Sequence, residues 1–125
     1  MTLHTHTEIE RALALIKKGK IIEGVAALTD AAKDPQLRQE ALGHRAHCLK
    51  SLGRYEEAIA DLDEFLRTRP EDADAATVHA ELKALLGRYE ESAAEAAQIL
   101  SRNPLHHAAL SLLVNCHAAR GGGGN

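Results

Sequence analysis

Three residues near the middle of the sequence carry side chains that bind zinc in many proteins. His44, His47 and Cys48 are three and four residues apart, and this spacing brings side chains to one face of a helix. Imidazole nitrogen and cysteine sulfur are ordinary zinc ligands. A metal or catalytic site is therefore one hypothesis, and it depends on how the surrounding helices orient these three side chains.

The sequence repeats itself with a fixed period. Residues 52–58 read LGRYEEA, and residues 86–92 read LGRYEES, 34 positions later. The same offset aligns a column of glycines at Gly19, Gly53, Gly87 and Gly121. A period of this length is typical of stacked supersecondary units, in which each unit packs on its neighbours.

Each unit reads as a pair of helices. In the second unit Leu42, Ala46 and Leu49 recur at helical spacing, and Gly53 suits the left-handed position just after a helix. Pro70 closes the following helix because proline cannot donate a backbone hydrogen bond. The pattern predicts no strand and seven helices, at about residues 5–18, 21–33, 38–52, 55–68, 73–86, 89–102 and 105–120.

These features together resemble the tetratricopeptide repeat. The shared features are the 34-residue helix pair, a small residue within the first helix (Ala12, Ala46 and Ala80), Gly-x-Tyr at the turn and a closing proline. The resemblance implies an all-α, right-handed superhelical solenoid of antiparallel helix pairs. It places a repeat domain at residues 1–120, with repeats at about 5–38, 39–72 and 73–106 and a final helix at 107–120. Residues 121–125 are then expected to form a flexible glycine-rich tail.

The period argues against the metal site. Cys48 and Cys116 are two periods apart and share a column with Ala14 and Leu82, which indicates a packed position. Cys48 then points away from His44 and His47. The sequence also contains no phosphate-binding glycine motif and no nucleophile elbow. We therefore expect no metal, no cofactor and no catalytic residue.

Composition excludes other classes of partner. The net charge of −3 and the three aromatic residues, Tyr55, Phe65 and Tyr89, do not favour nucleic-acid binding. No segment is apolar and long enough to cross a membrane, and the start lacks the pattern of a signal peptide. Two cysteines do not form a disulfide framework in a chain of this kind. The sequence predicts a cytoplasmic protein with reduced thiols.

Proteins that resemble this family bind peptides or partner helices on a concave face, which the first helix of each pair lines. The period identifies the matching positions as a partner-binding groove of Glu10, Leu13, Lys17, Glu40, His44, His47, Ser51, Asp74, Val78, Glu81 and Asn115. Some family members hold a peptide's C-terminal carboxylate with lysines, an arginine and asparagines on these stripes. Asp74 would repel a carboxylate, so we do not expect such a clamp here.

One column departs from the family. Arg11, Arg45 and His79 stand where a large apolar residue is usual, and the apolar residue returns only as Leu113. We expect the aliphatic or ring portions of these three polar side chains to pack while their polar ends reach solvent.

The last helix is unusually apolar for the end of a repeat array. It carries no Asp, Glu, Lys or Arg between Leu105 and Ala119, whereas terminal repeats normally have a polar outer face. Leu110, Leu113 and Val114 are therefore candidate contacts for a second copy. Alternatively, the natural chain continues past Gly121.

The sequence thus predicts a non-enzymatic scaffold for protein–protein interaction that binds a peptide or partner helix in the groove. Two alternatives stay open at this point. One is an N-terminal regulatory or substrate-docking module of a larger enzyme, such as a transferase. The other is a homo-oligomerisation module that acts through its last helix.

Overall fold

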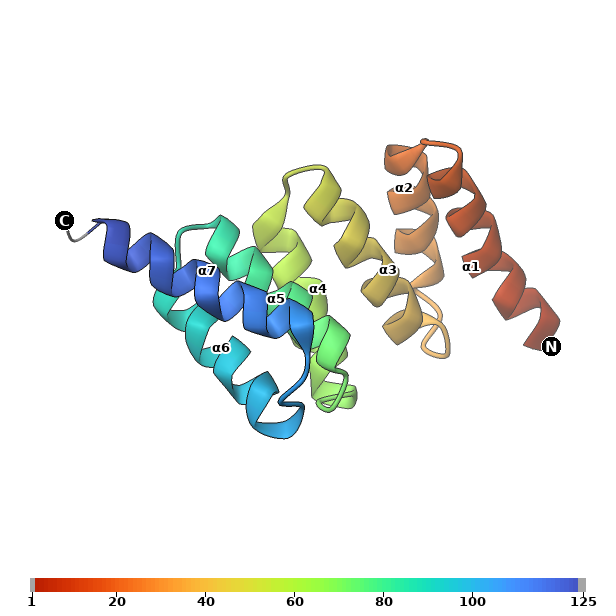
Figure 1. The fold of residues 1–125 in the computed structure, drawn as a ribbon. Coiled ribbons are helices and arrows are strands. Elements are labelled where there is room, and N and C mark those ends of the chain that lie inside the picture. Colours follow the sequence, from red (N-terminus) through yellow and green to blue (C-terminus); the bar gives the residue numbers. More distant parts are fainter. Residues whose placement is uncertain (1, 124–125) are drawn as a thin grey trace. The chain divides into compact units, whose positions relative to one another are not determined.

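The computed structural model describes the backbone of residues 2–123 and the side chains of residues 7–121. All regular structure in this part is helical (Figure 1). The helices are α1 (Thr2–Lys17), α2 (Ile21–Ala31), α3 (Arg38–Ser51), α4 (Tyr55–Thr68), α5 (Ala73–Leu85), α6 (Tyr89–Arg102) and α7 (His107–Gly123). The predicted all-α fold is confirmed. Over these residues no helix is both long and apolar enough to span a bilayer.

The helices belong to two compact units that divide after Thr68. In the first unit each helix packs against the next, α1 on α2, α2 on α3 and α3 on α4. In the second unit α6 packs against both α5 and α7, and α5 makes a smaller contact with α7. Each unit is therefore built from neighbouring helices joined by short turns.

The glycine column ends the first helix of each pair. Gly19, Gly53 and Gly87 have φ values of +85°, +78° and +81°, a left-handed conformation that a Cβ atom would disfavour. At the second of these turns the Gly53 N–H donates to the Lys50 carbonyl at 3.0 Å, and the Arg54 N–H donates to the Leu49 carbonyl at 2.8 Å. This pair of bonds is the Schellman motif, which satisfies carbonyl groups that the helix end leaves open.

Small residues allow close helix packing in the first unit. Ala12, Ala41 and Ala46 are fully buried. A Cβ atom at Gly24 of α2 would lie 2.5 Å from Ile16 Cγ1 of α1, so a glycine is needed for this approach of the two helices. The core around them also contains Ile9, Leu28, Leu37 and Leu42.

The second unit has its own buried centre. Leu82, Ala96 and Ala109 are fully buried, and Cys116 is 1 % exposed. Ser92 is also fully buried, and its hydroxyl donates to the Ala80 carbonyl at 2.7 Å. The serine thus has a hydrogen-bond partner inside an apolar environment, as a buried hydroxyl requires.

The helix ends differ from the sequence prediction at both ends of the chain. The first helix begins at Thr2, three residues before the expected start, and the last begins at His107 and continues to Gly123. Gly121 therefore lies within α7 and does not adopt the left-handed conformation of the other three glycines. Glycine permits that conformation without enforcing it. Residues 124–125 of the expected tail lie outside the described part.

Candidate functional site

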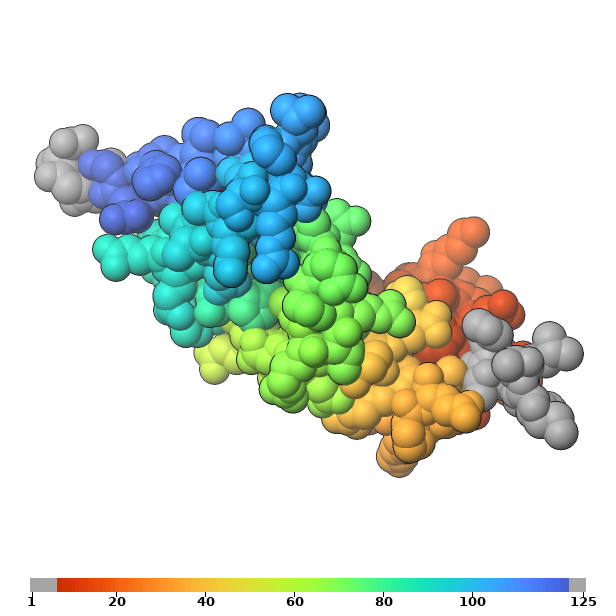
Figure 2. Space-filling view, turned by 90° about the horizontal axis from the view of Figure 1, so that it is seen from below, coloured from red at the N-terminus to blue at the C-terminus, as the bar shows by residue number. Residues whose placement is uncertain are grey.

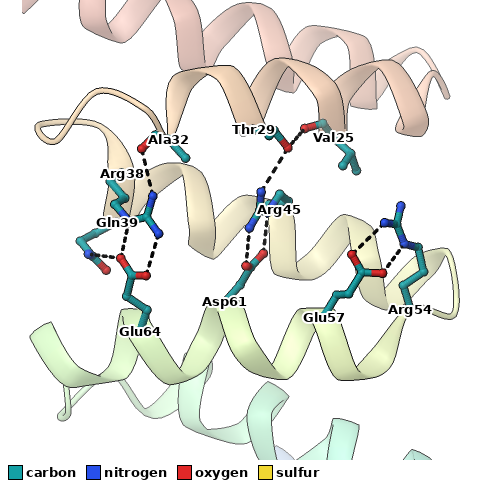
Figure 3. A network of polar contacts seen from close by, with 10 residues as sticks. All are labelled: Val25, Thr29, Ala32, Arg38, Gln39, Arg45, Arg54, Glu57, Asp61 and Glu64. Carbon is teal, nitrogen blue, oxygen red and sulfur yellow. Dashed lines mark hydrogen bonds and ion pairs between the residues drawn. The ribbon is translucent and has the colours of Figure 1, made fainter.

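A buried ion pair joins the two helices of the second repeat. Arg45 of α3 donates from Nε to Asp61 Oδ2 at 2.7 Å and from Nη2 to Asp61 Oδ1 at 2.6 Å (Figure 3). The Arg45 side chain is 23 % exposed and that of Asp61 is 6 % exposed. Arg45 Nη1 also donates to the Thr29 hydroxyl of α2 at 3.1 Å, so one guanidinium connects three helices.

The same contact recurs one period later with different residues. His79 of α5 lies in the column of Arg45, and Glu95 of α6 lies in the column of Asp61. His79 Nδ1 is 2.5 Å from Glu95 Oε1, and Lys83 Nζ is 2.7 Å from Glu95 Oε2. Burial raises the pKa of Glu95, but hydrogen bonds from His79 and Lys83 outweigh it and leave that pKa below its usual value. Because an ionised carboxylate can only accept, His79 Nδ1 carries the hydrogen.

These contacts correct one expectation from the sequence. The polar ends of Arg45 and His79 do not extend into solvent but turn to acidic partners on the next helix. Arg11 is exposed, and the position that corresponds to Asp61 in its own repeat is Ala27. The sequence contains the signal that was missed, since both partner pairs are 16 residues apart and the two pairs are 34 residues apart.

Two further ion pairs connect or cap these helices. Arg38 at the start of α3 binds Glu64 of α4 through two hydrogen bonds, of 2.5 and 2.8 Å (Figure 3). The Arg38 hydrogen bond lowers the pKa of Glu64 to about 2. Arg54, just before α4, likewise binds Glu57 in the first turn of that helix. The Glu64 carboxylate thus joins α3 to α4, whereas the Glu57 carboxylate holds Arg54 at the start of α4.

The predicted groove residues of the first unit lie on α1 and α3. Glu10 and Lys17 are exposed on α1, whereas Leu13 is half-buried and packs against the core of this unit. On α3 the imidazole of His47 is exposed, and Glu40 and His44 are half-buried. Ser51 is also exposed, and its hydroxyl donates to the His47 carbonyl.

The predicted groove residues of the second unit lie on α5 and α7. Asp74 and Asn115 are exposed, and Val78 and Glu81 are half-buried. His106, just before α7, places Nε2 at 3.3 Å from Asp74 Oδ1, a contact that the sequence did not indicate. Asp74 retains a 97 % exposed side chain despite this contact, so it remains available to a ligand.

The two cysteines are buried, as the period predicted. Cys48 is 5 % exposed and Cys116 is 1 % exposed, and burial raises the pKa of the Cys48 thiol. His47 on the same helix is exposed, so it and Cys48 project in different directions. Ala14, in the same column, is exposed because no described helix packs on that side of α1. Among the side chains that the structure describes, no three His, Cys, Asp or Glu residues form a group that could hold a metal ion.

The sequence profile of the tetratricopeptide repeat matches three overlapping stretches, residues 9–73, 45–99 and 77–121. The chain belongs to the tetratricopeptide repeat family. The helix pairs and the left-handed glycines at their turns are therefore the repeat units of this family. No curated protein sequence matches the chain closely.

Solved structures share this tetratricopeptide repeat fold. A tetratricopeptide repeat protein from Parabacteroides merdae is 22 % identical with a TM-score of 0.84, covering 90 % of this chain and 45 % of its own. The first repeat domain of Spaghetti (RPAP3), bound to the HSP90 peptide SRMEEVD, is 17 % identical with a TM-score of 0.85, covering 94 % of this chain and 93 % of its own. The second repeat domain of human RPAP3, in complex with the HSP70 peptide SGPTIEEVD, is 18 % identical with a TM-score of 0.83. The match covers 93 % of this chain and 97 % of the RPAP3 domain.

These structural similarities show that the chain has the tetratricopeptide repeat fold. The chain spans less than half the length of the Parabacteroides protein but nearly the whole of the two RPAP3 domains.

Proposed function

We propose that this chain is a non-enzymatic scaffold that binds a peptide or partner helix on the first helices of its repeats. The observation that carries the proposal is the polar, accessible stripe on these helices in a tetratricopeptide repeat chain. Glu10, Lys17 and His47 are exposed in the first unit, and Asp74 and Asn115 in the second. The fold provides helix faces that are held in place by buried contacts, which lowers the entropic cost of binding.

The environments of the Cys48 thiol and of the Asp61 and Glu64 carboxylates fit a binding role. A reactive cysteine needs an accessible thiol with a lowered pKa, whereas Cys48 is buried and the pKa of its thiol is raised. The carboxylates of Asp61 and Glu64 are engaged by arginines between helices. The accessible surface of these helices is therefore where we place the function.

The charges of the stripe favour a partner without an acidic tail. Four of the stripe residues are acidic, Glu10, Glu40, Asp74 and Glu81, and Lys17 is the only Lys or Arg among them. The peptides named for the two RPAP3 structures both end in Glu-Glu-Val-Asp. Like charges on the two sides of an interface oppose binding. We therefore propose that this chain recognises a segment that is neutral or basic where those peptides are acidic.

A pull-down from cell lysate tests the binding surface. A triple variant with Glu40→Ala, His44→Ala and Glu81→Ala should lose the proteins that the wild type recovers. A matched variant with Glu23→Ala, Glu56→Ala and Gln98→Ala changes three exposed residues on the second helices of the pairs, and it should keep them. Equal recovery by all three proteins would show that the stripe is not the binding surface.

The charge preference has a separate measurement. Fluorescence anisotropy with labelled SRMEEVD should show no saturable binding at protein concentrations up to about 100 µM, because the acidic groups of the stripe oppose the peptide. The same peptide with its two glutamates and its aspartate changed to lysine should bind more tightly at low salt than at high salt. Tight binding of SRMEEVD itself would contradict the proposed preference.

A further inference from the structure

The outer face of α7 is uncovered at positions that are buried in α3. Two periods separate the helices, so Leu110, Val114 and His117 correspond to Leu42, Ala46 and Leu49. In α3 these positions are at most 2 % exposed, whereas Leu110 is 47 % and Val114 is 57 % exposed.

The neighbouring face of α7 is packed just as it is in α3. Ala109 and Cys116 of α7 correspond to Ala41 and Cys48 of α3, and all four are buried. The difference is therefore confined to one face. The helix that follows α3, α4, packs against α3, whereas no helix follows α7 in the described residues. Figure 2 shows α7 in blue against the cyan α6, with the outer edge of α7 bare in this view.

The charge pattern indicates what kind of helix fits this face. Where α3 meets α4 the central contact is Arg45–Asp61, and where α5 meets α6 it is His79–Glu95. The corresponding residue of α7 is Leu113. A helix with an acidic residue at this point would bury a carboxylate against leucine with no cation to compensate it, which is costly. The fitting helix is therefore uncharged at its centre.

The helices α4 and α6 do not meet that requirement, because they carry Asp61 and Glu95 at the point in question. The helix α2 has Ala27 there, but it is already packed between α1 and α3. The helix α7 has no Asp, Glu, Lys or Arg from residue 107 to residue 119, and its outer face is uncovered. An isologous pair of α7 helices would bring Leu113 of one copy against Leu113 of the other. We propose that the chain forms a homodimer through the α7 face made by Leu110, Leu113 and Val114.

The expected dimer is weak, because a single helix face offers less area than the roughly 800 Å² per partner of a standard interface. It goes beyond the proposed peptide-binding role and uses a different set of residues. In α7 the predicted groove residue is Asn115, which lies outside the proposed dimer face.

Complementary charge variants test the pairing. Sedimentation equilibrium from about 1 to 500 µM should show the 13.5 kDa wild-type chain approaching twice its mass. Leu113→Arg and Leu113→Glu should each weaken dimerisation by about 100-fold or more, because like charges meet at the centre of the contact. An equimolar mixture of the two should regain dimerisation to within about 10-fold of wild type, since it recreates the Arg45–Asp61 type of pair across the interface.

Two controls keep the result interpretable. Ile22 on α2 is 73 % exposed, and Ile22→Arg removes an exposed apolar group elsewhere, so it should leave the dimer unchanged. Val114→Glu changes a more exposed residue of the same face and should weaken the dimer without loss of helical circular dichroism. A wild-type chain that stays monomeric at 500 µM overturns the proposal, and so do Leu113 variants that dimerise as the wild type does.

Discussion

The guanidinium of Arg45 and the carboxylate of Asp61 form a two-point ion pair between α3 and α4, with distances of 2.6 and 2.7 Å. One period later His79 and Glu95 form the corresponding contact between α5 and α6. The same helix-to-helix position is thus polar in two successive repeats. A repeat array can keep such a polar contact because each unit satisfies it internally.

Removal of one partner should show how much the pair contributes to stability. We expect Asp61→Ala to lower the free energy of unfolding by about 2–3 kcal/mol, because the partly buried Arg45 is left without its anion. Urea denaturation followed by circular dichroism measures this. The double replacement Arg45→Leu with Asp61→Leu should recover most of the loss. Glu57→Gln, which removes a more exposed pair on the same helix, is the matched control and should have a much smaller effect.

We expect the stabilisation that the Arg38–Glu64 pair contributes to be lost in acid. The folded-state pKa of Glu64 is lowered from 4.5 to about 2, so the folded state binds this proton less readily than the unfolded state. The stabilisation is complete above pH 4.5 and disappears as the pH falls towards 2. An acid titration of thermal unfolding should therefore be less steep in this range for Glu64→Gln. In Arg38→Gln the pKa of Glu64, followed by carbon NMR, should return towards its ordinary value.

Replacement by alanine should change the stability in opposite directions at two positions of the glycine column, Gly87 and Gly121. Gly87 has a φ of +81°, and Gly87→Ala should lower the free energy of unfolding by about 1 kcal/mol through backbone strain. Gly121 is helical with no neighbouring atom within 4 Å of an added Cβ. Gly121→Ala should therefore be neutral or stabilise by up to about 0.5 kcal/mol, since alanine favours a helix. Thermal unfolding of the two variants decides this, and equal destabilisation would contradict a helical Gly121.

Thiol labelling should report on the packing of the cysteines. Cys48 and Cys116 are buried, so a water-soluble maleimide should modify them only when the repeats open. Labelling should then accelerate with urea well below the main unfolding transition if the end of the chain opens locally. Ser51→Cys adds an exposed thiol to the same helix as Cys48, and that thiol should react rapidly in the native protein. Rapid labelling of native Cys48 would place it on the surface.

The repeat architecture was predictable from the sequence because its signals are local. The 34-residue offset, the glycines at the turns and the apolar spacing of Leu42, Ala46 and Leu49 depend only on residues near one another in the chain. The burial of Cys48 and Cys116 was predictable for the same reason, since their column contains Leu82. Gly121 shows the limit of this reasoning, because a glycine can either end a helix or lie within one, and the period does not distinguish the two.

The predicted binding stripe remains a prediction of the sequence and the family. Glu10, Lys17, His47 and Asp74 are exposed, as binding to this stripe requires. The contact between His106 and Asp74 joins residues 32 positions apart, and residue type alone did not suggest it.

By itself the sequence determined the family, the all-α fold and the repeat period. The 16-residue spacing identifies possible partners for Arg45 and His79, but only the tertiary structure decided that their polar groups turn towards those partners. Arg45 turns inward because Asp61 on the next helix offers a buried carboxylate, whereas Arg11 is exposed and has Ala27 at the corresponding position. Burial of a charge is favourable only with a compensating partner, and the partner lies on another helix. The exposed face of α7 was likewise decided in three dimensions, because exposure depends on which helix packs there.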